Sequence, residues 1–143
     1  MIEALMAFAI QAAPATPSWR IVAVSRESVD ALDTASVRRD RGGASYSVAH
    51  VYPDASYGSK FSIIRYWSDC RGRNATMLTI QSHNLALQPN PPTGANNLPI
   101  TDPIEPASAM SKLERAACDV NARFQMPAIN DTAAMVRTAD TMF

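Results

Sequence analysis

Polar and apolar residues alternate along much of the chain before residue 82, which is the pattern of β-strands that bury one face. In one such stretch Tyr46, Val48 and Tyr52 recur at even spacing, and the most aromatic stretch follows at residues 60–69. Because the predicted strands follow one another through short connections, we expect an antiparallel meander of about five or six strands. The predicted strands are residues 19–25, 29–33, 44–52, 60–69 and 74–81.

Clusters of turn-forming residues separate these strands. Asp33, Thr34 and Ser36 carry short oxygen-bearing side chains that hydrogen-bond their own backbone, so we expect a turn at residues 33–36, before residues 37–39. Gly42 and Gly43 are expected to supply the positive φ angles of a tight hairpin. The chain should turn again at Gly72, ahead of the last predicted strand.

The hydrophobic period changes to that of a helix at residues 108–124. Met110, Leu113 and Ala117 fall on one helical face, and Ser108 is a suitable N-cap. The sequence therefore predicts one main C-terminal helix, packed against the sheet in an α+β domain.

Proline dominates residues 87–106 and excludes both a helix and a central strand there, because it lacks a backbone donor and fixes φ. We expect this stretch to be a long surface loop. After Pro127, Asn130 or Asp131 can cap a modest helical pattern, so either a second short helix or a frayed tail is expected.

The start of the chain has the character of an export signal. Residues 1–13 run apolar from Ala4 to Ile10 and end in small residues before Pro14, as the tail of a secretory signal peptide does. A packed N-terminal helix is the alternative. The predicted organisation is a signal-like segment at 1–13, a linker at 14–18, an α+β domain at 19–124 and a C-terminal tail at 125–143.

Length and charge limit the partners. A chain of 143 residues can bury a core without metals or extra crosslinks. Its 13 basic residues balance 13 acidic ones, so it lacks the electrostatic footprint of a nucleic-acid binder. No apolar stretch approaches the roughly 18 residues that span a bilayer, and phosphate loops and dinucleotide fingerprints are absent. We therefore expect no nucleic-acid partner, no transmembrane span and no cofactor.

Cys70 and Cys118 are the only cysteines. In an exported protein they are most simply one disulfide, because the periplasm oxidises thiols. The bond would pin the helix to the end of a strand and contribute about 4 kcal/mol. A catalytic thiol or a pair of metal ligands is the alternative, although each needs a nearby His and a short spacing that this chain lacks.

His50 and His83 are the only histidines, and each lies on or beside a predicted strand. They could meet across the sheet and, with Asp54 or Asp69, form a metal site or an acid–base pair, because neutral imidazole binds metals and moves protons. This supports an alternative hypothesis of a small metal-binding or hydrolytic periplasmic protein. No nucleophile elbow accompanies them, so the main interpretation assigns no catalytic residue and no metal.

Five short stretches carry a family resemblance that extends over residues 19–120. They are Trp19-Arg20-Ile21-Val22, Asp33 with Ser36-Val37-Arg38-Arg39, Asp69-Cys70, Pro106-Ala107-Ser108, and Ala116-Ala117-Cys118. Together they resemble the surface-adhesin protein E family of small bacterial envelope proteins. The resemblance implies an antiparallel sheet packed against a helix, in a family whose named adhesin binds host extracellular-matrix and plasma proteins.

The resulting hypothesis is a non-enzymatic envelope protein, periplasmic or secreted, that binds another macromolecule. The binding surface would be the open face of the sheet or the proline-rich residues 87–106. A further hypothesis makes the domain an accessory of a larger envelope assembly.

Overall fold

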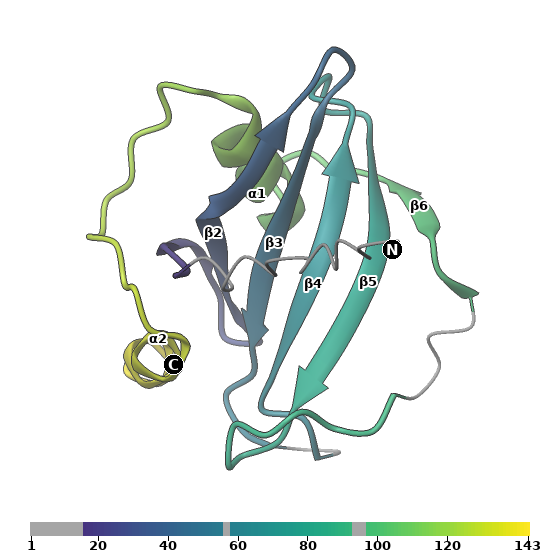
Figure 1. Ribbon diagram of the computed structural model, residues 1–143. Helices are drawn as coiled ribbons and strands as arrows, with labels where there is room; N and C mark the ends of the chain where they lie inside the picture. Colours follow the sequence, from purple (N-terminus) through teal and green to yellow (C-terminus); the bar gives the residue numbers. More distant parts are fainter. Residues whose placement is uncertain (1–15, 56–57, 93–96) are drawn as a thin grey trace, which may run out of the picture.

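Six strands form one antiparallel sheet, and their order in the sheet is their order in the chain (Figure 1). The computed structural model describes residues 16–55, 58–92 and 97–143, so the signal-like segment 1–13 and the start of the linker lie outside the described residues. The arrangement confirms the predicted α+β fold with a meander sheet. The elements are β1 (Trp19–Val24), β2 (Val29–Arg39), β3 (Ala44–Val51), β4 (Phe61–Ser68), β5 (Asn74–His83), β6 (Ile100–Pro103), α1 (Ala109–Cys118) and α2 (Thr132–Asp140).

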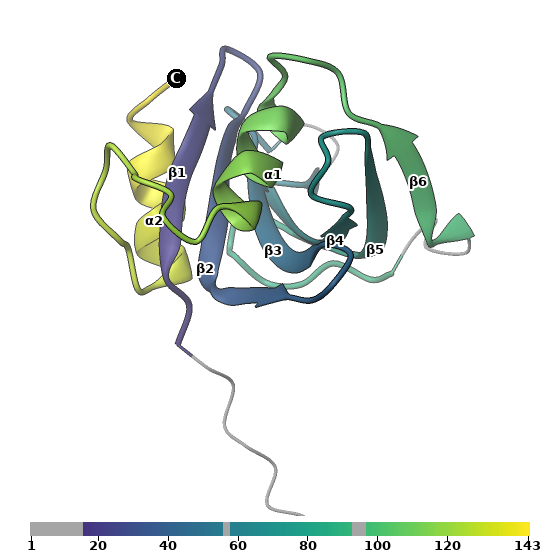
Figure 2. The same ribbon diagram turned by 90° about the horizontal axis from the view of Figure 1, so that it is seen from above.

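Each face of the sheet packs against its own helix. Because neighbouring residues of a strand project to opposite faces, β3 contributes Val48 to one core cluster and Val51 to the other. Leu113 of α1 packs in the first cluster and Met135 of α2 in the second. Figure 2 accordingly shows the two helices on different sides of β1.

Residues 125–143, for which the sequence left a helix or a frayed tail open, form α2 and the segment that leads into it. Asp131 is the N-cap, and its carboxylate accepts a hydrogen bond from the backbone N–H of Ala134 at 2.9 Å. Met135 and Ala139 have no exposed surface. The predicted single main helix is therefore joined by a second one that covers the other face.

The turn predicted at residues 33–36 is wrong, because β2 continues through them as one strand of eleven residues. The local chemistry is nevertheless as expected: the Asp33 carboxylate accepts from the N–H of Ala35, and the Ser36 hydroxyl donates to the Asp33 carbonyl. These bonds shift the pairing with β3 between Asp33 and Arg38. The result is an irregularity inside the strand, of the kind that side-chain competition for the backbone produces.

The hairpin between β2 and β3 forms, but its glycines are not used as predicted. Among the described glycines only Gly58 and Gly72 have positive φ. Gly43 is needed for close approach instead, since a Cβ atom there would lie 1.8 Å from the carbonyl oxygen of Ser68. The side chain of Asp40 closes the turn by accepting from the N–H groups of both hairpin glycines.

Two predicted boundaries are corrected. The loop predicted at 87–106 contains β6, which pairs with β5 at the edge of the sheet, where Pro103 is tolerated because one side of the strand needs no partner. The helix predicted at 108–124 begins after the expected cap Ser108 but ends at Cys118. Asp119 ends it, because its carboxylate accepts from the N–H of Asn121 and turns the chain.

Candidate binding groove

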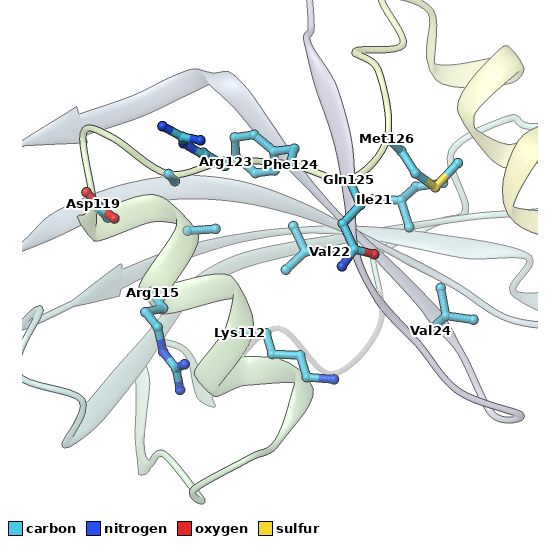
Figure 3. A pocket seen from close by; sticks show the side chains of 12 residues that line it. Ile21, Val22, Val24, Lys112, Arg115, Asp119, Arg123, Phe124, Gln125 and Met126 are labelled. Atoms are coloured by element: carbon cyan, nitrogen blue, oxygen red, sulfur yellow. The ribbon is translucent and has the colours of Figure 1, made fainter.

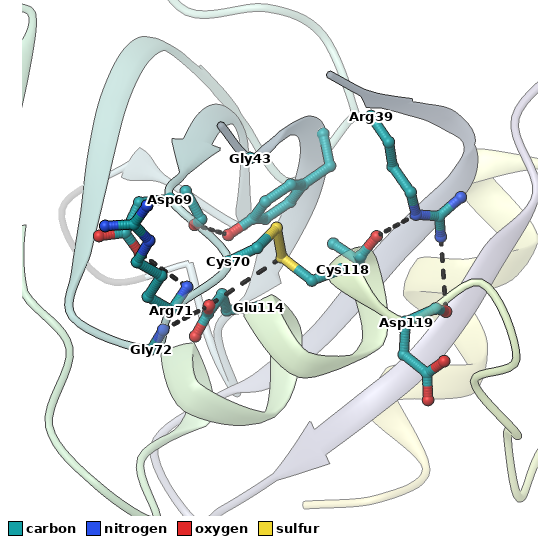
Figure 4. Close-up of a disulfide and its surroundings, with 12 residues drawn as sticks. Arg39, Gly43, Asp69, Cys70, Arg71, Gly72, Glu114, Cys118 and Asp119 are labelled. Atoms are coloured by element: carbon teal, nitrogen blue, oxygen red, sulfur yellow. Dashed lines mark hydrogen bonds between the residues drawn. A yellow bond between two sulfur atoms is a disulfide. The ribbon is translucent and has the colours of Figure 1, made fainter. Parts of the chain in front are cut away.

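Cys70 and Cys118 form the predicted disulfide, with 5.6 Å between their Cα atoms. The bond joins the turn after β4 to the last residue of α1 (Figure 4). It rules out the free-thiol and metal-ligand alternatives for the folded protein, since no free cysteine is left. A disulfide fits a protein of an oxidising, extracytoplasmic compartment.

Polar contacts around the disulfide also fix the position of α1. The carboxylate of Glu114, which is only 5% exposed, accepts a hydrogen bond from the backbone N–H of Gly72 at 3.0 Å. Arg39 donates from Nε to the carbonyl oxygen of Ala117 at 3.0 Å. Each contact ties α1 to a different part of the sheet, so the disulfide belongs to a structural clamp.

A buried tyrosine lies beneath the same helix. The hydroxyl groups of Tyr46 and Ser68 are 2.5 Å apart, and neither residue is exposed. Burial raises the pKa of Tyr46, and it raises that of the neighbouring Tyr66 to about 12. Both phenols are thus neutral hydrogen-bonding groups near neutral pH.

The structure does not bring His50 and His83 together. His50 on β3 pairs with Ser62 on β4, while His83 on β5 pairs with the next residue of β4, Phe61. Side chains of paired residues share a face and successive residues alternate, so the two imidazoles project from opposite faces of the sheet. The hypothesis of one site built on both histidines is therefore wrong in its geometry.

Each histidine instead has its own structural partner. His50 bonds through Nδ1 to the carboxylate of Asp30, whose other oxygen accepts from the hydroxyl of Ser28 at 3.2 Å. His83 stacks on Phe61 with 4.4 Å between ring centroids, and burial lowers its pKa. Within the described residues no group of three or more His, Cys, Asp or Glu side chains could hold a metal ion.

The expected partners Asp54 and Asp69 do not complete a site. The carboxylate of Asp69 accepts from the backbone N–H of Arg71 at 3.0 Å and so shapes the turn that carries Cys70. Asp54 follows β3 in an exposed loop. Neither residue belongs to a metal-binding group of the described chain.

A groove of about 590 Å³ lies between β1, α1 and the segment that follows α1 (Figure 3). We call residues 119–129, which cross from α1 to the second face of the sheet, the strap. The volume is within the range of protein binding sites, which are usually several hundred Å³. The lining residues are Ile21, Val22, Val24, Lys112, Arg115, Ala116, Asp119, Ala122, Arg123, Phe124, Gln125 and Met126.

Contacts between the strap and β1 fix one side of the groove. At one end Trp19 and Ile129 exchange two backbone hydrogen bonds of 2.9 Å. Further along, the guanidinium of Arg20 donates to the carbonyl oxygen of Met126 at 2.8 Å and lies 5.2 Å from the centre of the Phe124 ring. The strap is therefore anchored to β1 at defined points.

The groove combines an apolar floor with a basic rim. Val22 and Phe124 are half-buried and pack at the edge of the core beneath α1. Lys112, Arg115 and Arg123 are exposed around them, against one acidic lining residue, Asp119. In Figure 3 the rim side chains come from both α1 and the strap, so two elements contribute to the positive charge.

The surfaces expected from the sequence differ from this groove. On the open part of the sheet Arg65 donates to the hydroxyls of Ser45 and Ser47, so its guanidinium is bonded within the sheet. Sequence reasoning missed the groove because β1 and the strap are about a hundred residues apart. Phe124, an aromatic residue beside Arg123, is a local signal of the groove, but the hydrophobic period places it in the predicted helix at 108–124.

Comparisons with protein-family models, with curated proteins and with solved structures found no match to this chain. The resemblance to the surface-adhesin protein E family therefore stays a prediction. In the part of the chain that the structure describes, no helix has the length and apolar character needed to cross a membrane.

Proposed function

We propose that this protein is a non-enzymatic periplasmic or secreted protein that binds another macromolecule through the groove between β1, α1 and the strap. The observation that carries the proposal is the combination of an apolar floor, Val22 and Phe124, with exposed cationic side chains around it. Apolar contact supplies affinity and charged groups at a rim supply orientation and specificity in many interfaces.

The disulfide supports both the compartment and the rigidity of the site. Cys118 fixes the end of α1, and α1 provides one wall of the groove through Lys112 and Ala116. A wall that is held in place before binding reduces the ordering cost of association. The resemblance to an adhesin family points to the same class of function.

A photo-crosslinking amino acid at Val24 tests the proposal. Val24 lines the groove and is 50% exposed, so a benzophenone side chain there should react with whatever occupies it. Ile80, 39% exposed on β5, is the matched control position away from the groove. In envelope or extracellular fractions of the source cells, we expect one discrete adduct from position 24 and none from position 80.

A variant whose groove is filled by a large side chain provides the second part of the experiment. The substitution Ala122→Trp places a large side chain in the lining and should abolish the adduct while the far-ultraviolet circular dichroism spectrum stays unchanged. The adduct protein, identified by mass spectrometry and purified, should bind wild type but not this variant. Equal labelling from positions 24 and 80, or labelling that survives the filled groove, would refute binding at this site.

A further inference from the structure

One edge of the sheet lies along the groove with backbone groups that are free to pair. Trp19 directs its N–H and C=O away from β2 and bonds Ile129 with both. Because backbone groups of a strand alternate in direction, those of Ile21, two residues on, point the same way. Among the described residues no loop or helix pairs with the backbone of Ile21 on that side. The position beside β1 is therefore filled at Trp19 and vacant from Ile21 onward.

The opposite edge of the sheet is protected against strand addition. β6 has only four residues, its last residue Pro103 lacks a backbone donor, and Pro99 precedes it. Short edge strands and edge prolines are the usual means of preventing intermolecular pairing. β1 has six residues and no proline. Its pairing with β2 is irregular between Ile21 and Ala23, so the outward backbone groups on either side of the irregularity are those of Ile21 and Val24. Of the two edges, only β1 lies beside the groove.

The charge around this edge selects the partner. Three cationic side chains, Lys112, Arg115 and Arg123, line the groove with one anionic side chain, Asp119. Within the described chain none of the three cations is in an ion pair, since the salt bridges there are His50–Asp30 and Lys60–Asp140. Their charge is thus available to an occupant, and an anionic occupant is favoured.

We propose that the groove binds an extended, acidic segment of another protein, which adds to β1 as a further strand. The inference rests on the proposed function and specifies its partner. Backbone pairing with Ile21 and Val24 gives affinity that is independent of side chains. Every second side chain of the segment points to the face that carries α1, where apolar ones contact Val22 and Phe124 and acidic ones face the cationic rim.

Synthetic hexapeptides provide the probe. Acetyl-ETVTET-amide places one Val between two Glu side chains on a single face of an added strand, and acetyl-KTVTKT-amide is the matched control of opposite charge. We expect the acidic peptide to bind the purified chain about ten-fold more tightly by isothermal titration, with affinity that falls as salt is raised. In NMR spectra the amide signals of Ile21 and Val24 should shift and gain protection from exchange. Two further acidic peptides carry N-methyl groups at alternate amides, one at the odd positions and the other at the even positions. One of the two should no longer bind, because its methyl groups face β1 and block backbone pairing.

A matched pair of charge reversals locates the interaction. Arg123→Glu alters the rim and should weaken binding of the acidic peptide about ten-fold while improving binding of the lysine peptide. Arg41→Glu makes the same change at an exposed site on the β2–β3 hairpin and should leave both affinities unchanged.

Several outcomes would overturn the inference. Equal binding of the two peptides, or equal binding of all N-methylated versions, would exclude an acidic added strand. A groove that captures a partner from position 24 but binds no acidic peptide would leave the proposed function intact and refute only this occupant. Concentration-dependent dimers in sedimentation, abolished by Ala122→Trp, would assign the groove to a second copy of the chain instead.

Discussion

The two faces of the sheet are covered by helices that are held in different ways. α1 is linked covalently through Cys118 and buries two apolar side chains, Leu113 and Ala117, along with the carboxylate of Glu114. α2 has no covalent link and buries only apolar side chains, of which Met135 is the largest. The comparison teaches that the crosslinked helix also buries a charged side chain, whereas the helix without a crosslink buries apolar side chains alone.

The polar contacts of α2 lie at its ends. The indole Nε1 of Trp19 donates to the hydroxyl of Thr132 at 3.0 Å at the start of the helix. The ammonium group of Lys60 donates to the carboxylate of Asp140 at 2.5 Å at its end. These contacts set the direction of α2 across the sheet, and its buried side chains lie between them.

Removal of the disulfide should have the largest effect. The double substitution Cys70→Ser and Cys118→Ser opens a loop with a sequence separation of 48 residues, and the chain-entropy model gives a loss of about 4 kcal/mol. Urea unfolding followed by circular dichroism measures the loss. Hydrogen exchange should show faster opening of α1 than of α2. An equal loss of protection in both helices would show that the faces are not held independently.

Truncation of Met135 should come next. Met135→Ala leaves a cavity in the cluster beneath α2, and large-to-small changes of this kind cost about 3 kcal/mol. Leu85→Ala, at a residue that is 70% exposed, is the control and should change the free energy of unfolding by less than about 0.5 kcal/mol. Local opening should now be faster in α2 and unchanged in α1, the reverse of the result expected for the disulfide variant.

The features of the two faces that could be predicted from the sequence are those with local signals. Even spacing of apolar residues indicated the strands, and the stripe of Met110, Leu113 and Ala117 indicated the buried face of α1. The disulfide could be predicted because the chain has only two cysteines and is expected to be exported to an oxidising compartment. Each signal depends on residues close together in the chain, or on a residue type with one common fate in an oxidising compartment.

The parts that the sequence did not predict depend on contacts between distant segments. The apolar pattern continues from Cys118 to Phe124, yet the helix ends at Cys118 because the carboxylate of Asp119 bonds the backbone beyond it. β6 forms only because Asn74–Met77 offer an edge to pair with. The groove needs β1 and the strap together. No periodicity within one segment indicates such a meeting.

Alkaline pH should act on the face under α1. Burial raises the pKa of Tyr66 to about 12 and also raises that of Tyr46, while an unfolded chain titrates its tyrosines near 10. Between these values the folded protein keeps a proton that the unfolded chain has lost, so the free energy of unfolding falls as pH rises. We expect Tyr66 alone to account for roughly 2 to 3 kcal/mol of the fall, and Tyr46 to add to it.

Tyrosine replacement separates this effect from general alkaline damage. In urea unfolding at pH 9 to 12, Tyr66→Phe should flatten the fall, and the double variant with Tyr46→Phe should flatten it further. Below pH 9, where both tyrosines are protonated in either state, the curves should run parallel. A double variant that destabilises with the same slope as wild type would assign the pH dependence to other groups.

The two helix caps offer the smallest and most closely matched test. Ser108→Ala and Asp131→Ala each remove a side chain that accepts from the backbone N–H three residues later, Ser111 at 3.1 Å and Ala134 at 2.9 Å. Each substitution should lower the free energy of unfolding by about 1 kcal/mol.

The difference between the faces should appear in local opening, measured by hydrogen exchange of the first helical turn. Fraying that begins at Asp131 can spread along a helix with no crosslink, whereas fraying from Ser108 meets the disulfide at Cys118. We therefore expect protection to be lost through most of α2 but only in the first turn of α1, and the same extent of loss in both helices would mean that the crosslink does not limit the motion of α1.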